Sequence, residues 1–198
     1  IKLRRQGIHY LLVNPYRARE LDALLNSTIS NITRNPELAI LSKKLGSWNL
    51  YKLGPYNVKK ISIPLSDCSV DPRYTNASYS LNSTELGIFL ELKATDINSR
   101  ITCRLNVPKL NLSDYDYLII DTKGSDNARV LMRFFLDNGK SFDVSYWQDV
   151  YILMNKPFDL HPYAGRTLRG ELYISLKSSD GTPTSISIQQ ISFIRVKD

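Results

Sequence analysis

Aromatic and polar side chains gather in one short stretch of the C-terminal half, where they could bind a sugar. Tyr146 and Trp147 place two rings beside the amide of Gln148 and the carboxylate of Asp149, and Tyr163 follows nearby in sequence. A sugar site needs this combination, because the faces of a pyranose are apolar while its hydroxyl groups require directed hydrogen bonds. The alternative is that these rings pack in a core, as alternating aromatic residues on strands usually do.

Trp48 with Tyr51 forms a second candidate of the same kind. Signatures of catalysis are missing, since the sequence contains no nucleophile elbow, phosphate-binding loop, metalloprotease helix or Rossmann glycine pattern. The closely spaced carboxylates Asp137 and Asp143 lie at expected strand ends and turns, where capping and solvation explain them. We therefore predict that the chain is not an enzyme.

Metal ligands are sparse as well. With two cysteines and two histidines far apart in sequence, a structural zinc site lacks ligands. A structural calcium ion held by backbone oxygens with Asp126 or Asp180 is left open, although neither turn carries a calcium-loop motif. No other cofactor is expected.

The pattern of modification signals points to an oxidising compartment. Cys68 and Cys103 could form one disulfide, the alternative being two buried free thiols. Five Asn-x-Ser/Thr sequons occur where chance predicts about two, and each marks a candidate N-glycosylation site. Their asparagines are Asn26, Asn31, Asn76, Asn82 and Asn111. We expect a secreted or cell-surface glycoprotein.

The net charge of +7 and the pI near 9.4 would favour an anionic partner. The basic residues are scattered, however, and no nucleic-acid-binding motif is present, so no nucleic acid partner is expected. No apolar run is long enough to span a membrane. Membrane attachment would require an anchor outside this sequence.

The hydrophobic period changes along the chain. Apolar residues recur at spacings of three and four over residues 15–45, which predicts a helix near 15–32 and a short helix near 36–45 that ends at Gly46. From residue 48 onward the period is two, with turn residues every eight to twelve positions. The Asn138-Gly139 pair predicts a hairpin with a type I′ turn.

These patterns predict a mainly β fold, an antiparallel β-sandwich or jelly roll preceded by an N-terminal helical segment. The predicted domains are residues 1–45, a stalk, cap or assembly element, and residues 46–198, the sandwich. The nine predicted strands cover residues 48–53, 57–64, 87–94, 100–107, 117–123, 129–136, 141–146, 171–177 and 185–196.

The cadence of the C-terminal half resembles a known group of folds. It runs through residues 115–121, 128–139, 146–147 and 170–196. Over residues 46–198 the chain looks like the galactose-binding-like jelly rolls, which include many carbohydrate-binding modules, and like domains of archaeal surface and membrane-anchored proteins. The resemblance implies a non-enzymatic module whose loops bind a glycan, sometimes with a structural calcium ion, and it carries over no individual binding residue.

Two functions follow as expectations. The first is glycan recognition or adhesion at the cell surface, with a glycan or a neighbouring surface protein as partner. The second is a structural role, as a subunit of an extracellular fibre or coat or as the ectodomain of a membrane-anchored protein. In the second case the apolar residues 8–13 would supply a strand to a neighbour's open sheet edge.

Overall fold

The computed structural model describes residues 10–14, 32, 38–54, 57–146 and 157–197, apart from the side chains of residues 40, 146 and 197. The chain divides into two compact units, residues 1–59 with 195–198 and residues 60–194. The first unit contains a three-stranded antiparallel sheet in the order β1-β3-β2. Its strands are β1 (Tyr10–Val13), β2 (Ala39–Leu45) and β3 (Trp48–Leu53).

The predicted helix over residues 36–45 is wrong, because Ala39–Leu45 forms strand β2, which pairs with β3 from Ala39 opposite Leu53 to Leu45 opposite Trp48. Gly46 has φ of 61° and lies in the hairpin turn between them. A positive φ is required both after a helix and in such a turn, so this glycine did not discriminate between the two. The first predicted helix, over residues 15–32, lies almost entirely outside the described residues.

The predicted boundary between residues 45 and 46 falls in this same turn. Strand β1 contains most of the segment expected to join a neighbour's sheet. In this chain it pairs with β3, from Tyr10 opposite Lys52 to Val13 opposite Asn49. Along one edge, the backbone of that segment is therefore already paired with another strand of the same chain.

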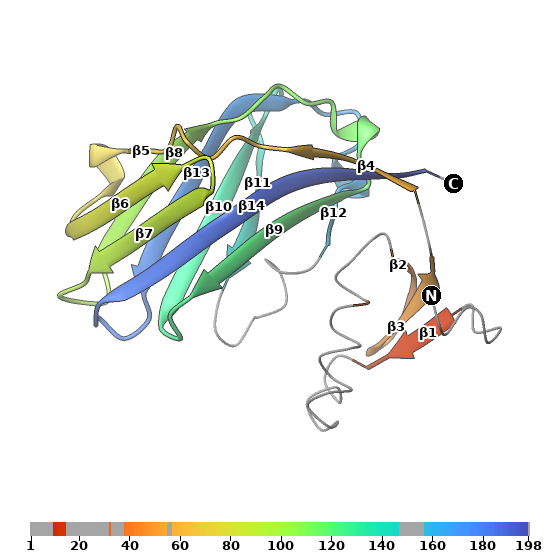
Figure 1. The fold of residues 1–198 in the computed structure, drawn as a ribbon, viewed down its shortest axis with the longest axis horizontal. Coiled ribbons are helices and arrows are strands. Elements are labelled where there is room, and N and C mark those ends of the chain that lie inside the picture. The colour runs from red at the N-terminus through yellow and green to blue at the C-terminus, as the bar shows by residue number, and fades with distance from the viewer. Residues whose placement is uncertain (1–9, 15–31, 33–37, 55–56, 147–156, 198) are drawn as a thin grey trace. The chain divides into compact units, whose positions relative to one another are not determined.

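The second unit is an antiparallel β-sandwich, as predicted (Figure 1). One sheet has the order β11-β10-β13-β8-β5, and the other has the order β12-β9-β14-β7-β6, with β4 also paired to β14. The five-stranded sheet contains β5 (Ser69–Val70), β8 (Arg100–Asn106), β10 (Ala128–Leu136), β11 (Ser141–Tyr146) and β13 (Leu168–Ser178). The six-stranded sheet contains β4 (Asn57–Ser62), β6 (Ser78–Thr84), β7 (Gly87–Lys93), β9 (Tyr117–Gly124), β12 (Phe158–Asp159) and β14 (Thr184–Lys197).

Alternate residues of these strands face one common core, as the period of two requires. Phe134 of β10 meets Phe193 of β14 edge to face, with ring centroids 6.3 Å apart. Among the described residues, three short 3-10 helices connect the strands, η2 (Pro72–Tyr74), η3 (Leu112–Asp114) and η5 (His161–Tyr163). No helix within the described ranges has the length and apolar composition that a membrane span requires.

The predicted hairpin at Asn138-Gly139 is confirmed, since it joins β10 to β11. Its turn is not type I′, because only Gly139 has positive φ, at 77°, and no described non-glycine residue does. The disulfide between Cys68 and Cys103 is confirmed as well. It connects the residue just before β5 to the middle of β8, inside the five-stranded sheet.

Candidate functional site

Most of the site predicted from the sequence lies outside the described residues, so it stays a prediction. Tyr146 ends β11, but its side chain and residues Trp147, Gln148 and Asp149 lie outside them. Tyr163 is described, and its ring stacks on Phe142, with centroids 4.5 Å apart, as part of the packing against the core. The placement of this tyrosine favours the packing interpretation.

The second sequence candidate is also divided. Trp48 and Tyr51 both belong to β3, three residues apart. Successive side chains of a strand point to opposite faces, so residues separated by three positions lie on opposite sides of the sheet. Burial raises the pKa of Tyr51, whereas Trp48 is exposed. These two rings do not form one platform.

A groove lies instead on the outward face of the five-stranded sheet, with a cavity volume of about 320 Å³. It is formed by three neighbouring strands and by η2. The lining residues are Leu131, Arg133 and Phe135 of β10, Tyr173 and Ser175 of β13, Arg100 and Thr102 of β8, and Tyr74 of η2. These described lining residues include aromatic rings, hydroxyl groups and guanidinium groups, and no carboxylate.

The register of the strands places these side chains in rows across the sheet. The floor of the groove is a row in which Leu131 lies opposite Ser175, and Ser175 lies opposite Thr102. The hydroxyl groups of Thr102 and Ser175 are 2.8 Å apart and share a hydrogen bond. Because residues on either side of each floor residue are buried in the core, the floor faces outward.

A row on each side of the floor carries positive charge. On one side Arg133 lies opposite Tyr173, which lies opposite Arg104. On the other side Arg129 lies opposite Lys177, which lies opposite Arg100. Neighbouring strands are about 4.8 Å apart and alternate residues of one strand about 6.7 Å apart, so both rows lie within reach of a ligand on the floor.

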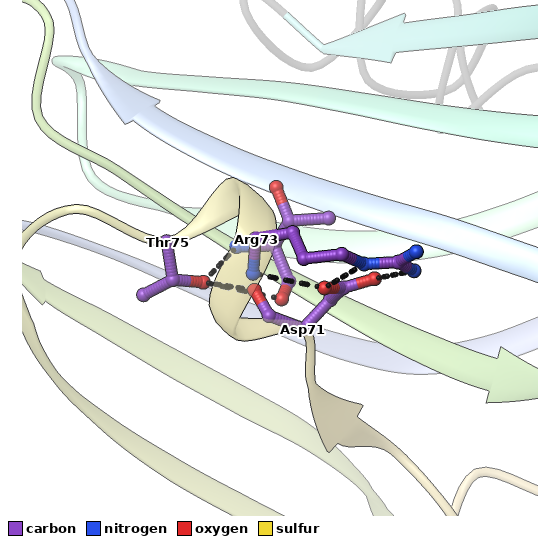
Figure 2. A network of polar contacts seen from close by, with 4 residues as sticks. Asp71, Arg73 and Thr75 are labelled. Atoms are coloured by element: carbon purple, nitrogen blue, oxygen red, sulfur yellow. Dashed lines mark hydrogen bonds and ion pairs between the residues drawn. The ribbon is translucent and has the colours of Figure 1, made fainter.

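The edge of the groove is a segment fastened along β8 (Figure 2). The amide of Asp71 donates a hydrogen bond to the carbonyl oxygen of Thr102 at 2.8 Å, and the amide of Thr102 donates to Thr75 Oγ1 at 3.1 Å. Asn76 continues this pairing, because its Oδ1 accepts a 2.8 Å hydrogen bond from the amide of Arg100. These bonds hold the intervening helix η2 at the groove.

Two arginines are oriented by this edge. Arg73 forms a two-pronged ion pair with Asp71, with Nε–Oδ1 and Nη2–Oδ2 distances of 3.0 and 2.7 Å. The guanidinium groups of Arg73 and Arg100 lie over the ring of Tyr74, 5.5 and 5.7 Å from its centroid. The hydrogen bond from Arg73 is the main cause that lowers the pKa of Asp71, and the same bond raises the pKa of Arg73.

The aromatic side of the groove is a connected group of rings. Tyr173 contacts Phe135 edge to face, with centroids 5.1 Å apart, and lies 6.3 Å from Tyr74. Arg133 is held by both oxygens of Asp143, each at 2.8 Å, and this hydrogen bonding raises the pKa of the arginine. Rings, hydroxyls and charged donors therefore face one open groove, and such a combination can bind a polyhydroxylated molecule.

The other predicted residues are distributed around the sandwich. Asn76, Asn82 and Asn111 are exposed, whereas Asn26 and Asn31 lie outside the described residues, and glycosylation of all five stays a prediction. Asp180 accepts hydrogen bonds on Oδ1 from Asn127, Ser178 and Thr182. These donors lower the pKa of Asp180 and stabilise the turn before β14; calcium binding there stays a prediction.

Comparisons with known proteins give similarity of fold alone. No protein-family model matches the sequence, and no curated protein is significantly similar to it. The glycoside hydrolase domain of Endo-D from Streptococcus pneumoniae R6 is 12% identical with a TM-score of 0.40, over 73% of this chain. The present chain spans 24% of that domain's length.

Two similar structures are carbohydrate-binding modules in complex with oligosaccharides. TmCBM61, in complex with β-1,4-galactotriose, is 9% identical with a TM-score of 0.35, and the match covers 72% of this chain and 89% of that one. The family 11 module from Clostridium thermocellum, in complex with a mixed-linked tetrasaccharide, is 10% identical with a TM-score of 0.33, covering 70% and 87%. The structures similar to this chain include carbohydrate-binding modules, and the expected link to archaeal surface proteins has no support among them.

Proposed function

We propose that this chain is a non-catalytic module that binds a glycan in the groove on the outward face of its five-stranded sheet. The observation that carries the proposal is the composition of the groove. Rings of Tyr74, Tyr173 and Phe135 lie beside the linked hydroxyls of Thr102 and Ser175. Apolar surface of this kind packs against a sugar face, and the polar groups bind its hydroxyls.

The groove is suited to a chain rather than to a small buried molecule. It is open to solvent along the sheet, and its residues come from neighbouring strands at regular spacing. A row of strands therefore offers repeated contacts to a polymer that lies across them. Because the side chains are positioned by rigid strands and by the fastened edge segment, the site is ordered before the ligand arrives, which lowers the entropy cost of binding.

A glycan array with purified protein tests the proposal, using two tyrosine variants. Tyr74→Ala removes a ring that lines the groove, whereas Tyr79→Ala removes a ring of similar exposure, 45% against 42%, from β6 of the other sheet. We expect Tyr74→Ala to weaken binding about tenfold or more, since tyrosine is common among the residues that dominate binding. Equal effects of the two substitutions, or binding to no glycan, would overturn the proposal.

We also propose that the protein is extracellular and glycosylated, which the disulfide and the three exposed sequon asparagines support. Intact mass of the native protein before and after enzymatic deglycosylation tests this. We expect a loss of mass and no free thiol. An unmodified polypeptide with two thiols would contradict the extracellular assignment.

The structural alternative rests on β1, which is an edge strand of the three-stranded sheet. An edge strand exposes unpaired backbone groups that a second chain could use. Sedimentation at several concentrations tests this alternative. Assembly that is lost on replacing Leu12 by Pro would support it, and a monomer at every concentration would exclude it.

A further inference from the structure

The rows beside the groove floor hold more positive charge than the fold requires. Arg129, Lys177 and Arg100 lie directly opposite one another on three adjacent strands. Like charges in directly opposed positions destabilise a sheet, so such a row opposes folding instead of supporting it. These opposed cations lower the stability of the fold and lie on an open groove. Their presence there points to a ligand that the charges bind.

The other sheet provides the comparison within the same molecule. On its outward face Lys93 and Lys123 are exposed, and exposed or half-buried carboxylates accompany them on the same strands, Glu91 on β7 and Asp121 on β9. On the five-stranded sheet, β13 also carries a half-buried carboxylate, Glu171, but it lies opposite Asn106 and six residues from Lys177. The row of Arg129, Lys177 and Arg100 itself contains no carboxylate.

Two carboxylates beside the groove are engaged by arginines. Asp143 uses both oxygens on Arg133, and Asp71 uses both on Arg73. Neither carboxylate lies in the row that contains Lys177 and Arg100. Asp143 and Asp71 are therefore not available to Lys177 and Arg100, which can attract an anionic ligand.

The guanidinium groups are also held in place before any ligand binds. Arg100 and Arg73 lie over the ring of Tyr74, and Asp71 fixes the second of them. A planar guanidinium presents paired N–H donors that match the oxygens of a carboxylate or a sulfate ester. Ordered donors of this kind bind an oxyanion at a lower entropy cost than freely moving side chains do.

We infer that the groove takes an acidic glycan, whose sugar units carry carboxylate or sulfate groups bound by Arg100, Lys177 and the cations beside them. This inference rests on the proposed function and names its ligand class. Sugar rings lie on the floor of Leu131, Ser175 and Thr102, and the acidic substituents point to the cationic row. A single-stranded nucleic acid fits less well, because its bases stack on aromatic faces and the floor of Leu131, Ser175 and Thr102 offers no ring.

The experiment compares acidic polysaccharides with neutral counterparts of the same backbone, by calorimetry on the full chain. The pairs are polygalacturonate with its methyl ester, and dextran sulfate with dextran, and they separate carboxylate from sulfate. We expect at least one acidic polysaccharide to bind about tenfold or more tightly than its neutral counterpart. The difference shrinks as salt is raised, because a Debye length of about 10 Å at 0.1 M falls to about 3 Å at 1 M.

Two double variants with the same change of net charge locate the effect. Arg100→Gln with Lys177→Gln removes two cations from the row beside the groove, and Lys93→Gln with Lys123→Gln removes two from the other sheet. We expect the first pair to abolish the preference for the acidic polymer and the second to leave it within about twofold of wild type. Circular dichroism verifies that both variants are folded.

The outcomes separate this inference from the proposed function. Equal binding of acidic and neutral polymers, or an equal loss in both double variants, overturns the inference and leaves glycan binding intact. If the protein binds none of the four polymers and no glycan on an array, both the inference and the proposed function are overturned. Another outcome is that a single-stranded oligonucleotide binds as tightly as the acidic polysaccharide and loses this binding in the Arg100→Gln, Lys177→Gln variant. That result would overturn the choice of a glycan as the ligand.

Discussion

Removing the Cys68–Cys103 disulfide tests how the edge of the groove is held. The bond closes a loop between residues separated by 35 positions. Its chain-entropy contribution for a loop of that length is about 4 kcal/mol at 25 °C. This is a large share of the ~5 to 15 kcal/mol that stabilises an ordinary domain. We therefore expect Cys68→Ala with Cys103→Ala to lower the Tm by roughly 8 to 15 °C.

The same change should act locally at the groove. The disulfide fastens the start of the segment that continues into β5 and η2, while the hydrogen bonds to Thr102 and Arg100 fasten its remainder. Without the disulfide the segment opens more often, and Arg73 becomes accessible to trypsin. We expect faster cleavage after Arg73 at a temperature where the sandwich itself stays folded.

Calorimetry and limited proteolysis of the oxidised wild type and the double variant measure both effects. Reduced wild type is the control, because it loses the bond and keeps both sulfur atoms in the core, where Cys103 is completely buried. Reduced wild type and double variant should therefore change in the same direction. A Tm within about 3 °C of the oxidised protein, with no faster cleavage after Arg73, would refute this account of the disulfide.

Three further outcomes can be measured by denaturant unfolding. Gly87→Ala should destabilise the protein by about 3 kcal/mol, because Gly87 has φ of 146° and an added Cβ would lie 2.6 Å from the carbonyl oxygen of Ile188; an effect below about 1 kcal/mol would contradict this. Asp71 has a lowered pKa, so the stability it contributes is complete above its unfolded pKa of about 3.9 and is lost as the pH falls through its folded value. Asp71→Asn should therefore flatten the loss of stability between about pH 5 and pH 2, and parallel acid curves would count against the ion pair with Arg73. Lys177→Gln should raise stability at low salt by a few tenths of a kcal/mol, since it removes a cation directly opposite Arg100, and a loss of stability would contradict the like-charge argument.

The sandwich was predictable because its strands carry local information. All nine segments predicted from the period of two form strands, eight of them in the sandwich and Trp48–Leu53 in the three-stranded sheet, and Ser141–Tyr146 has the bounds that the sequence gives. The missed strands show the limit of that signal. Ser78–Thr84 has the sequence SYSLNST, which reads as a polar loop because it is an edge strand with few buried side chains.

The groove could not be predicted, since it depends on which strands become neighbours. Arg100 and Lys177 are far apart in sequence and meet only because β8 pairs with β13. Strand β10 alone carried a weak signal for a binding face. Leu131, Arg133 and Phe135 occupy its outward positions, where polar residues are more usual. The aromatic stretch around Trp147 was a stronger local signal; Tyr163 packs against the core, and Trp147, Gln148 and Asp149 lie outside the described residues.

The most direct test of the central claim is an amide chemical-shift map of the protein titrated with a bound glycan. We expect the largest shifts on β8, β10 and β13 at the groove, at Thr102, Arg133, Tyr173 and Ser175, while β7 and β9 of the other sheet change little. Shifts concentrated around residues 146–163, or on the outward face of the six-stranded sheet, would place the binding site elsewhere and contradict the account.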